Sequence, residues 1–81
     1  MIEELSKAIG KDITGIMKSK GVSDYYIWCT CKLCTEPTLS KIKKGKYKKS
    51  LPLGKIIDLY KLLGEKDISI LGSDIKFIVK L

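Results

Sequence analysis

The sequence contains no histidine and no arginine, so all sixteen of its basic residues are lysine, against nine acidic residues. Histidine is the commonest general acid or base in enzymes and a frequent zinc ligand. Its absence argues against an enzyme, and a chain of 81 residues leaves little room for a deep catalytic cavity. We therefore expect no catalytic residue, no cofactor, no bound metal and no small-molecule ligand.

Long hydrophobic runs are also missing, which argues against a membrane-spanning helix. The first residues, Met-Ile-Glu-Glu, are acidic and do not lead into the basic and apolar regions of a signal peptide. We expect a cytoplasmic protein that does not contact a membrane.

Cysteines are few and odd in number, because the chain has three of them. Without an export signal, this count predicts reduced thiols rather than a disulfide framework. Cys29, Cys31 and Cys34 are close enough in sequence to suggest three zinc ligands, but a structural zinc site needs a fourth, which no other cysteine or histidine supplies. We favour the alternative in which Cys31 and Cys34 are small core residues.

The chain is rich in positive charge and has enough apolar residues to form a core. Hydrophobic residues make up 44% and charged residues 31%, a composition typical of a globular domain. A net charge of +7 favours a polyanionic partner such as nucleic acid. Seven lysines and no acidic residue lie between Pro37 and Ile57. We expect a single domain over residues 1–81.

The clearest local signal is Thr35–Lys46, TEPTLSKIKKGK, which predicts a short helix with a marked start and end. Its first threonine can cap the helix, and Pro37 falls in the first turn, where its missing N–H costs nothing. Gly45 can adopt the left-handed conformation that ends a helix. A helix this short is unstable alone, so we expect its apolar stripe, Leu39 and Ile42, to be buried.

Two helices are predicted before this segment. Apolar residues recur at spacings of three and four from Ile2 to Met17, which predicts a helix ending near Lys20, with a bend allowed at Gly10. A second helix is predicted from Asp24 to about Leu33. Its inward side chains are expected to be Ile27, Trp28, Cys31 and Cys34.

One helix and a strand pair are predicted after it. The helix begins at Ser50 or Leu51 and ends at Gly64. Residues 67–71 and 75–81 alternate in character, which predicts two strands joined by a hairpin loop, Gly72-Ser73-Asp74. The inward side chains of the last helix are expected to be Leu53, Ile56, Ile57, Tyr60 and Leu63.

The cap, the Thr-Leu-Ser-x-Ile stripe and the Gly-Lys end within Thr35–Lys46 resemble the helix-turn-helix domain of phage repressors and Cro proteins. The similarity covers residues 13–64 and leaves residues 65–81 as an extension. It implies a mostly α fold of four to five helices, Cro/repressor-like, with a short C-terminal β-hairpin or strand. The stretch from Gly21 to Thr35 is one residue longer than the family pattern and has Leu33 where glycine is frequent. We expect one of the flanking turns to absorb the extra residue, and an unusual turn conformation near Leu33.

The resemblance implies that the second helix lies across a DNA backbone while the third enters the major groove. We expect Glu36, Pro37, Thr38 and Lys41 to contact base edges, since glutamate can accept from cytosine, lysine can donate to guanine, and proline and the threonine methyl can touch thymine. Arginine, the usual bidentate partner of guanine, is not available. The expected phosphate contacts are Ser23, Tyr25, Thr35, Ser40, Lys43, Lys44, Lys46 and Tyr47.

The sequence thus predicts a sequence-specific, double-stranded DNA-binding transcription regulator, a homodimer on a two-fold operator. Its dimer strand would present Ile75, Phe77, Val79 and Leu81, unless these side chains pack on their own domain. Two alternatives stay open: a DNA-binding antitoxin or protein-interaction module of the same fold, and a basic protein that coats nucleic acid without sequence preference. The aromatic residues Tyr25, Tyr26 and Trp28 could stack on single-stranded bases, although we favour core packing with one hydroxyl on a phosphate.

Overall fold

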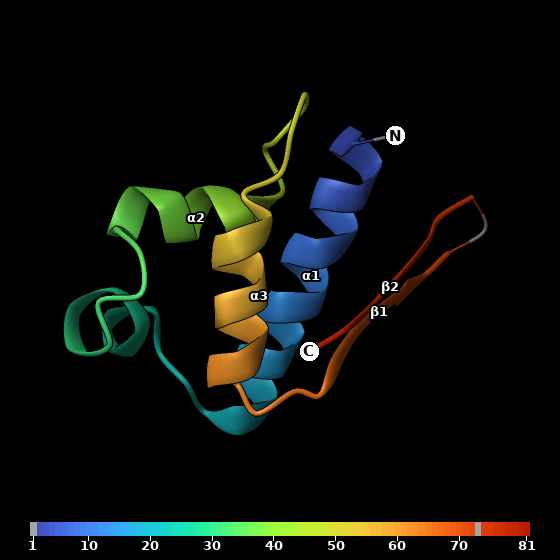
Figure 1. Ribbon diagram of the computed structural model, residues 1–81. Helices are drawn as coiled ribbons and strands as arrows, with labels where there is room; N and C mark the ends of the chain where they lie inside the picture. Colours follow the sequence, from blue (N-terminus) through green and yellow to red (C-terminus); the bar gives the residue numbers. More distant parts are fainter. Residues whose placement is uncertain (1, 73) are drawn as a thin grey trace.

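The computed structural model describes residues 2–72 and 74–81. Helix α2 (Glu36–Lys44) lies on one side of the long first helix, α1 (Ile2–Lys20), and the C-terminal hairpin lies on the other side (Figure 1). Helix α3 (Leu53–Leu62) packs against α1 between α2 and the hairpin. This arrangement confirms a mostly helical fold with a C-terminal antiparallel hairpin. Over the described residues, no helix has both the length and the apolar character needed to cross a bilayer. The elements are α1 (Ile2–Lys20), η1 (Tyr26–Thr30), α2 (Glu36–Lys44), α3 (Leu53–Leu62), β1 (Asp67–Leu71) and β2 (Lys76–Lys80).

Helix α1 runs without interruption for 19 residues, so the helix is not broken at Gly10. Its buried stripe includes Ile9, Ile13 and Met17, at the spacing that places side chains on one face. Gly10 also lies within this stripe, at a position where a side chain would clash with α2. A Cβ atom there would lie 2.5 Å from the carbonyl oxygen of Ile42, which is backbone of α2. The glycine therefore allows the two helices to approach closely.

The second helical segment differs from the prediction, because its regular part is the π-helix η1 rather than an α-helix over residues 24–33. The N–H of Cys31 donates to the carbonyl of Tyr26, five residues earlier, at 2.9 Å. A π-turn accommodates one residue more than an α-turn, so this segment holds its residues in fewer turns than an α-helix would. Lys32 follows with φ 52°, the unusual turn conformation expected near Leu33. Ile27 is fully buried.

Helix α2 agrees with its prediction at both ends. Helix α3 agrees at its end, where Gly64 is left-handed with φ 81°, but not at its start. Gly45 ends α2 in the left-handed conformation, with φ 64°. Helix α3 starts at Leu53 instead of Ser50 or Leu51, and Leu53 itself is exposed rather than inward. Leu59 is fully buried although its position was not predicted. The start shifts because Pro52 precedes the helix and supplies the first carbonyl to it, at 3.0 Å from the N–H of Ile56.

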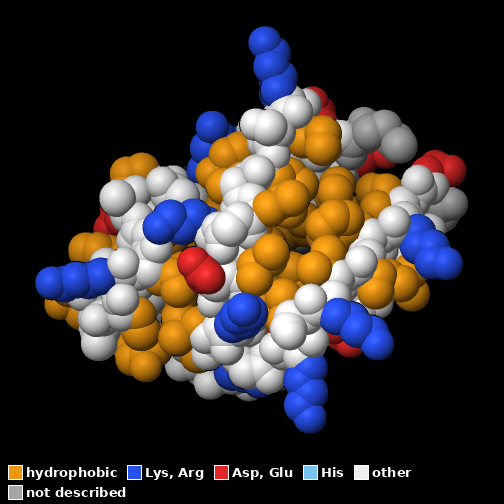
Figure 2. All heavy atoms as spheres, viewed as in Figure 1, with side chains coloured by type: hydrophobic (Ala, Val, Ile, Leu, Met, Phe, Trp, Pro, Cys, Tyr) orange, Lys and Arg blue, Asp and Glu red, His pale blue; other side chains and the backbone are white. Residues whose placement is uncertain are grey.

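The hairpin pairs β1 with β2 in antiparallel register, from Asp67 opposite Lys80 to Leu71 opposite Lys76. Strand β2 starts one residue later than predicted, and the predicted loop includes Ser73, which is outside the described residues. Figure 2 shows hydrophobic side chains gathered over the centre of the molecule and reaching the hairpin. Ile75, Phe77, Val79 and Leu81 are half-buried against the domain's own core. The alternation predicted for the last strand is therefore confirmed, and its inner face packs within the chain.

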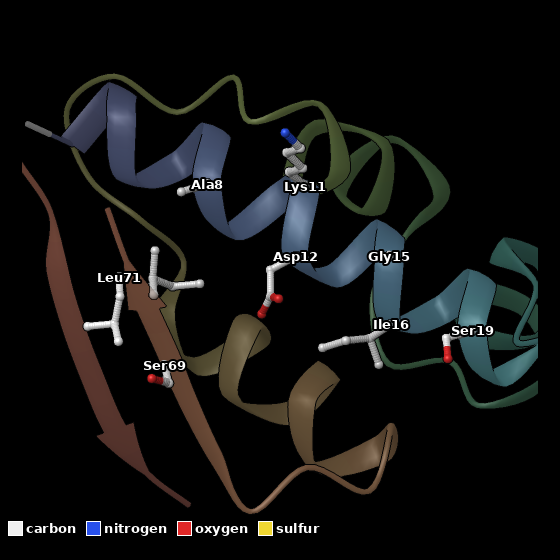
Figure 3. A pocket seen from close by; sticks show the side chains of 9 residues that line it. Ala8, Lys11, Asp12, Gly15, Ile16, Ser19, Ser69 and Leu71 are labelled. Carbon is white, nitrogen blue, oxygen red and sulfur yellow. The ribbon is translucent and has the colours of Figure 1, made fainter. Parts of the chain in front are cut away.

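A groove of about 550 Å³ remains between α1 and the hairpin. Figure 3 shows Ala8, Gly15 and Ile16 along its helical wall and Ser69 and Leu71 on the β1 wall. The side chain of Asp12 points from α1 toward α3, where its carboxylate accepts a hydrogen bond of 2.6 Å from the Tyr60 hydroxyl. Burial and the adjacent carboxylate raise the pKa of Tyr60, which keeps the phenol protonated as the donor.

Candidate nucleic-acid interface

The N-terminal tip of α2 is held by a pair of threonines. The Oγ1 of Thr35 accepts the N–H of Thr38 at 3.3 Å and donates to its Oγ1 at 2.9 Å. These bonds cap the helix and fix both hydroxyls. Glu36 and Pro37 are exposed between them, and Thr38 is half-buried. The structure thus gathers three of the predicted base-contacting residues at one rigid corner.

Lys41, the fourth of those residues, is exposed one turn further along α2. Its ammonium nitrogen lies 4.5 Å from the centre of the Tyr47 ring, an arrangement that attracts a cation to the ring face. The Tyr47 backbone is anchored in turn, because its N–H donates to the buried Oγ of Ser6 at 3.1 Å. Burial raises the pKa of Tyr47, so the ring remains a neutral phenol. Lys41 is therefore held at the outer face of α2 by contacts that begin in α1.

Lys43 was predicted to contact phosphate from a stretch of sequence without acidic residues, but in the structure it has an acidic neighbour. Its ammonium nitrogen lies 2.6 Å from a carboxylate oxygen of Asp24, and its side chain is 23% exposed. The two residues are 19 positions apart, so no local sequence pattern could reveal the pair. The contact joins the start of the second helical segment to the end of α2. The pair also matches the charge of the Asp24 carboxylate, which remains 51% exposed and would otherwise repel a polyanion.

The remaining predicted phosphate-binding residues lie around this corner of the molecule. Ser40 is half-buried, and it shares a depression of about 310 Å³ with Lys44. The Oγ of Ser23 accepts the N–H of Tyr26 at 3.1 Å, so Ser23 caps the second helical segment while staying exposed. Tyr25 is 61% exposed and meets Trp28 edge to face, with ring centres 5.3 Å apart. The exposed lysines of this group are Lys44 and Lys46.

Three residues outside the predicted contacts to duplex DNA lie beside the tip of α2, and one of them, Trp28, was considered for stacking on single-stranded bases. Trp28, Lys32 and Lys55 line a groove of about 600 Å³ together with Thr35 and Glu36. The Lys55 ammonium donates to the carbonyl of Leu33 at 2.9 Å, which ties α3 to the turn before α2. Lys55 belongs to the acid-free lysine stretch, so this signal was available in the sequence. Lys32 and Trp28 come to the groove only through the left-handed turn.

The cysteines lie near this surface without forming a metal site. Cys34 is buried, and burial raises the pKa of its thiol. Cys29 and Cys31 are half-buried. Within residues 2–72 and 74–81, no three side chains of His, Cys, Asp or Glu come together as a metal site requires.

Comparisons of the chain with protein-family models, with curated proteins and with solved structures found no match. A function for this surface therefore has to follow from the chemistry and placement of its residues.

Proposed function

We propose that this protein binds double-stranded DNA with α2 in the major groove and acts as a sequence-specific transcription regulator. The observation that carries the proposal is the exposure of a short, capped helix whose apolar side is fully occupied. Leu39 and Ile42 are 1% and 2% exposed, so the apolar stripe of α2 is not available to another partner. Its outer side offers hydroxyls, one carboxylate and lysines, which are the groups that contact nucleic acid.

The helical pair η1 and α2 would act as a helix-turn-helix unit of the Cro/repressor type. The turn between them contains the left-handed Lys32. In such units the second helix enters the groove with its N-terminal residues foremost. This orientation would bring Glu36, Pro37, Thr38 and Lys41 to base edges. A longer second helical segment, containing a π-turn, distinguishes this chain from the family pattern.

Phosphate contacts would come from both sides of the groove. On the α2 side the candidates are Thr35, Ser40, Lys44, Lys46 and Tyr47, and on the other side they are Ser23 and Tyr25. Lys43 is reassigned to an internal ion pair with Asp24, since its charge is already matched at 2.6 Å. An exposed lysine without such a partner can contact a phosphate without first giving up an ion pair.

The central experiment is selection of bound duplexes from a random pool, followed by competition. A regulator should enrich one sequence and keep it in the presence of excess random duplex, whereas a coating protein should lose it. Lys41→Ala should weaken the selected duplex by about 1–3 kcal/mol and relax one base position. Lys44→Ala should weaken all duplexes alike. Enrichment of no sequence would overturn the proposal.

We further propose that two copies associate, so that two half-sites roughly 34 Å apart are bound together. The hairpin is the candidate contact, because Leu71 and Ile78 are 67% and 53% exposed on it. A short two-stranded sheet is marginally stable, and a second hairpin packed on this face would remove both apolar side chains from water. Sedimentation velocity should find a dimer that Ile78→Lys converts to a folded monomer. A wild-type monomer at high concentration would contradict this part.

A further inference from the structure

Four lysines converge on one depression outside the α2 tip. It measures about 440 Å³ and lies between the first turns of α1 and the loop that follows α2. Figure 1 shows this loop beside the N-terminal end of α1. The lining side chains are Lys7 from α1, Lys44 from α2, and Lys46 and Lys48 from the loop, together with Glu3.

Two contacts hold the walls of this depression together. Gly45 forms part of the lining, and its φ of 64° favours a residue without a side chain. A Cβ atom at Gly45 would lie 2.8 Å from the backbone nitrogen of Lys7, so the loop and α1 are in backbone contact. One residue earlier in α1, the buried Ser6 accepts the Tyr47 N–H at 3.1 Å. The lysines are therefore brought together by the fold and cannot move apart with their backbones.

The charge of the depression is mostly unmatched by its own residues. Glu3 brings the one carboxylate among the lining residues, and its oxygen lies 3.6 Å from the Lys7 ammonium. Both side chains of this pair are exposed, at 49% and 66%, so the pair is weak and screened by salt. Four lysines against one glutamate give the lining of this depression a formal charge of +3. An anion with several oxygen acceptors would relieve their mutual repulsion.

We propose that this depression is a phosphate-binding site, and that Lys7 extends the contact with a polyanion beyond the helix-turn-helix unit. The ligand chemistry is a phosphate group, either from a DNA backbone or as a free phosphate. With DNA as its source, the inference rests on the proposed function. Glu3 then acts as an internal competitor, since its carboxylate occupies the Lys7 ammonium until phosphate displaces it.

The test uses the full chain and three variants. Lys7→Gln removes one charge from the depression, and Lys18→Gln removes one charge from the exposed far end of the same helix as a matched control. The salt dependence of random-duplex binding should flatten by about 0.9 in log–log slope for Lys7→Gln and stay unchanged for Lys18→Gln. Glu3→Gln should tighten binding about twofold, a gain that misfolding cannot imitate.

A second measurement uses inorganic phosphate against chloride at equal ionic strength. Phosphate should shift the backbone amide signals of Lys7, Gly45 and Lys46 in the wild type and leave those of Gly45 and Lys46 unshifted in Lys7→Gln. If no duplex is bound but these shifts persist, the proposed function fails and the depression is a site for free phosphate. If a duplex is selected while Lys7→Gln and Lys18→Gln have equal slopes and phosphate shifts no signal, the function stands and the site is overturned.

Discussion

The two sides of α1 are packed in different ways. Toward α2 the contact is between backbones, because Gly10 lies against the carbonyl groups that end α2 and Gly45 lies against the second turn of α1. Toward the hairpin the contact is between side chains, and a groove of about 550 Å³ stays open beside β1 (Figure 3). Backbone cannot change rotamer to relieve a clash, whereas side chains can. The angle of α2 is thus set more rigidly than the angle of the hairpin.

The largest loss of stability should come from truncating a buried side chain of α2. Leu39→Ala removes a side chain that is 1% exposed, and we expect it to lower the free energy of unfolding by about 2–5 kcal/mol. Leu53→Ala, on α3 and 43% exposed, is the matched control and should change it by less than about 0.5 kcal/mol. Urea denaturation followed by circular dichroism measures both. Equal losses would show that α2 is not held in place by its buried stripe.

Gly10→Ala tests the backbone contact directly. Its new Cβ would meet two carbonyl oxygens of α2 at 2.5 Å, so one helix must shift. We expect a loss of about 1–3 kcal/mol even though alanine is the better helix former. Thermal melts together with duplex affinity measure the effect. Wild-type stability with unchanged affinity would mean that the helices are not held at this distance.

Tyr60→Phe breaks the polar contact beside the groove and should cost about 1–2 kcal/mol, since Tyr60 donates to the Asp12 carboxylate at 2.6 Å. Burial and that carboxylate raise the pKa of Tyr60 above the ordinary value of about 10. The unfolded chain loses the proton first, so the contribution is complete below about pH 10 and disappears as the pH rises further.

Unfolding midpoints between pH 8 and pH 11 test this linkage. The wild type should lose stability above about pH 10, and Tyr60→Phe should lose less. Parallel curves for the two proteins would show that Tyr60 ionises alike in the folded and unfolded chain.

The smallest expected change in the free energy of unfolding is an increase, for Gly15→Ala. Gly15 lies within α1, and a Cβ atom there would meet nothing within 4 Å. Gly15→Ala should therefore raise the free energy of unfolding by about 0.5–1 kcal/mol through helix propensity alone. Differential scanning calorimetry of this variant beside Gly10→Ala compares the same substitution five residues apart. A loss at both positions would remove the distinction between the two sides of α1.

The sequence was sufficient to predict α2, because its cap, its apolar stripe and its end are all local signals. It was not sufficient to predict the conformation of the second helical segment, since no residue type within Tyr26–Thr30 indicates a π-turn. Gly10 was predicted to weaken α1, and its contact with α2 depends on residues 32 positions away. The same holds for the candidate site: exposure of Glu36 and Lys41 follows from helix periodicity, while the Lys43 pair with Asp24 follows from tertiary packing.

The contacts of α1 also bear on the order of events during synthesis. Its polar partners are distant, since Ser6 and Tyr47 are 41 residues apart and Asp12 and Tyr60 are 48 apart. Ribosomes add about 5–20 residues per second, so the roughly forty residues from the end of α1 to Tyr60 take roughly 2–8 s to appear. In the part of that interval before α2 has been made, α1 is a lone helix of marginal stability with its apolar stripe in water. The nascent chain therefore exposes this apolar stripe before it can present the outer face of α2.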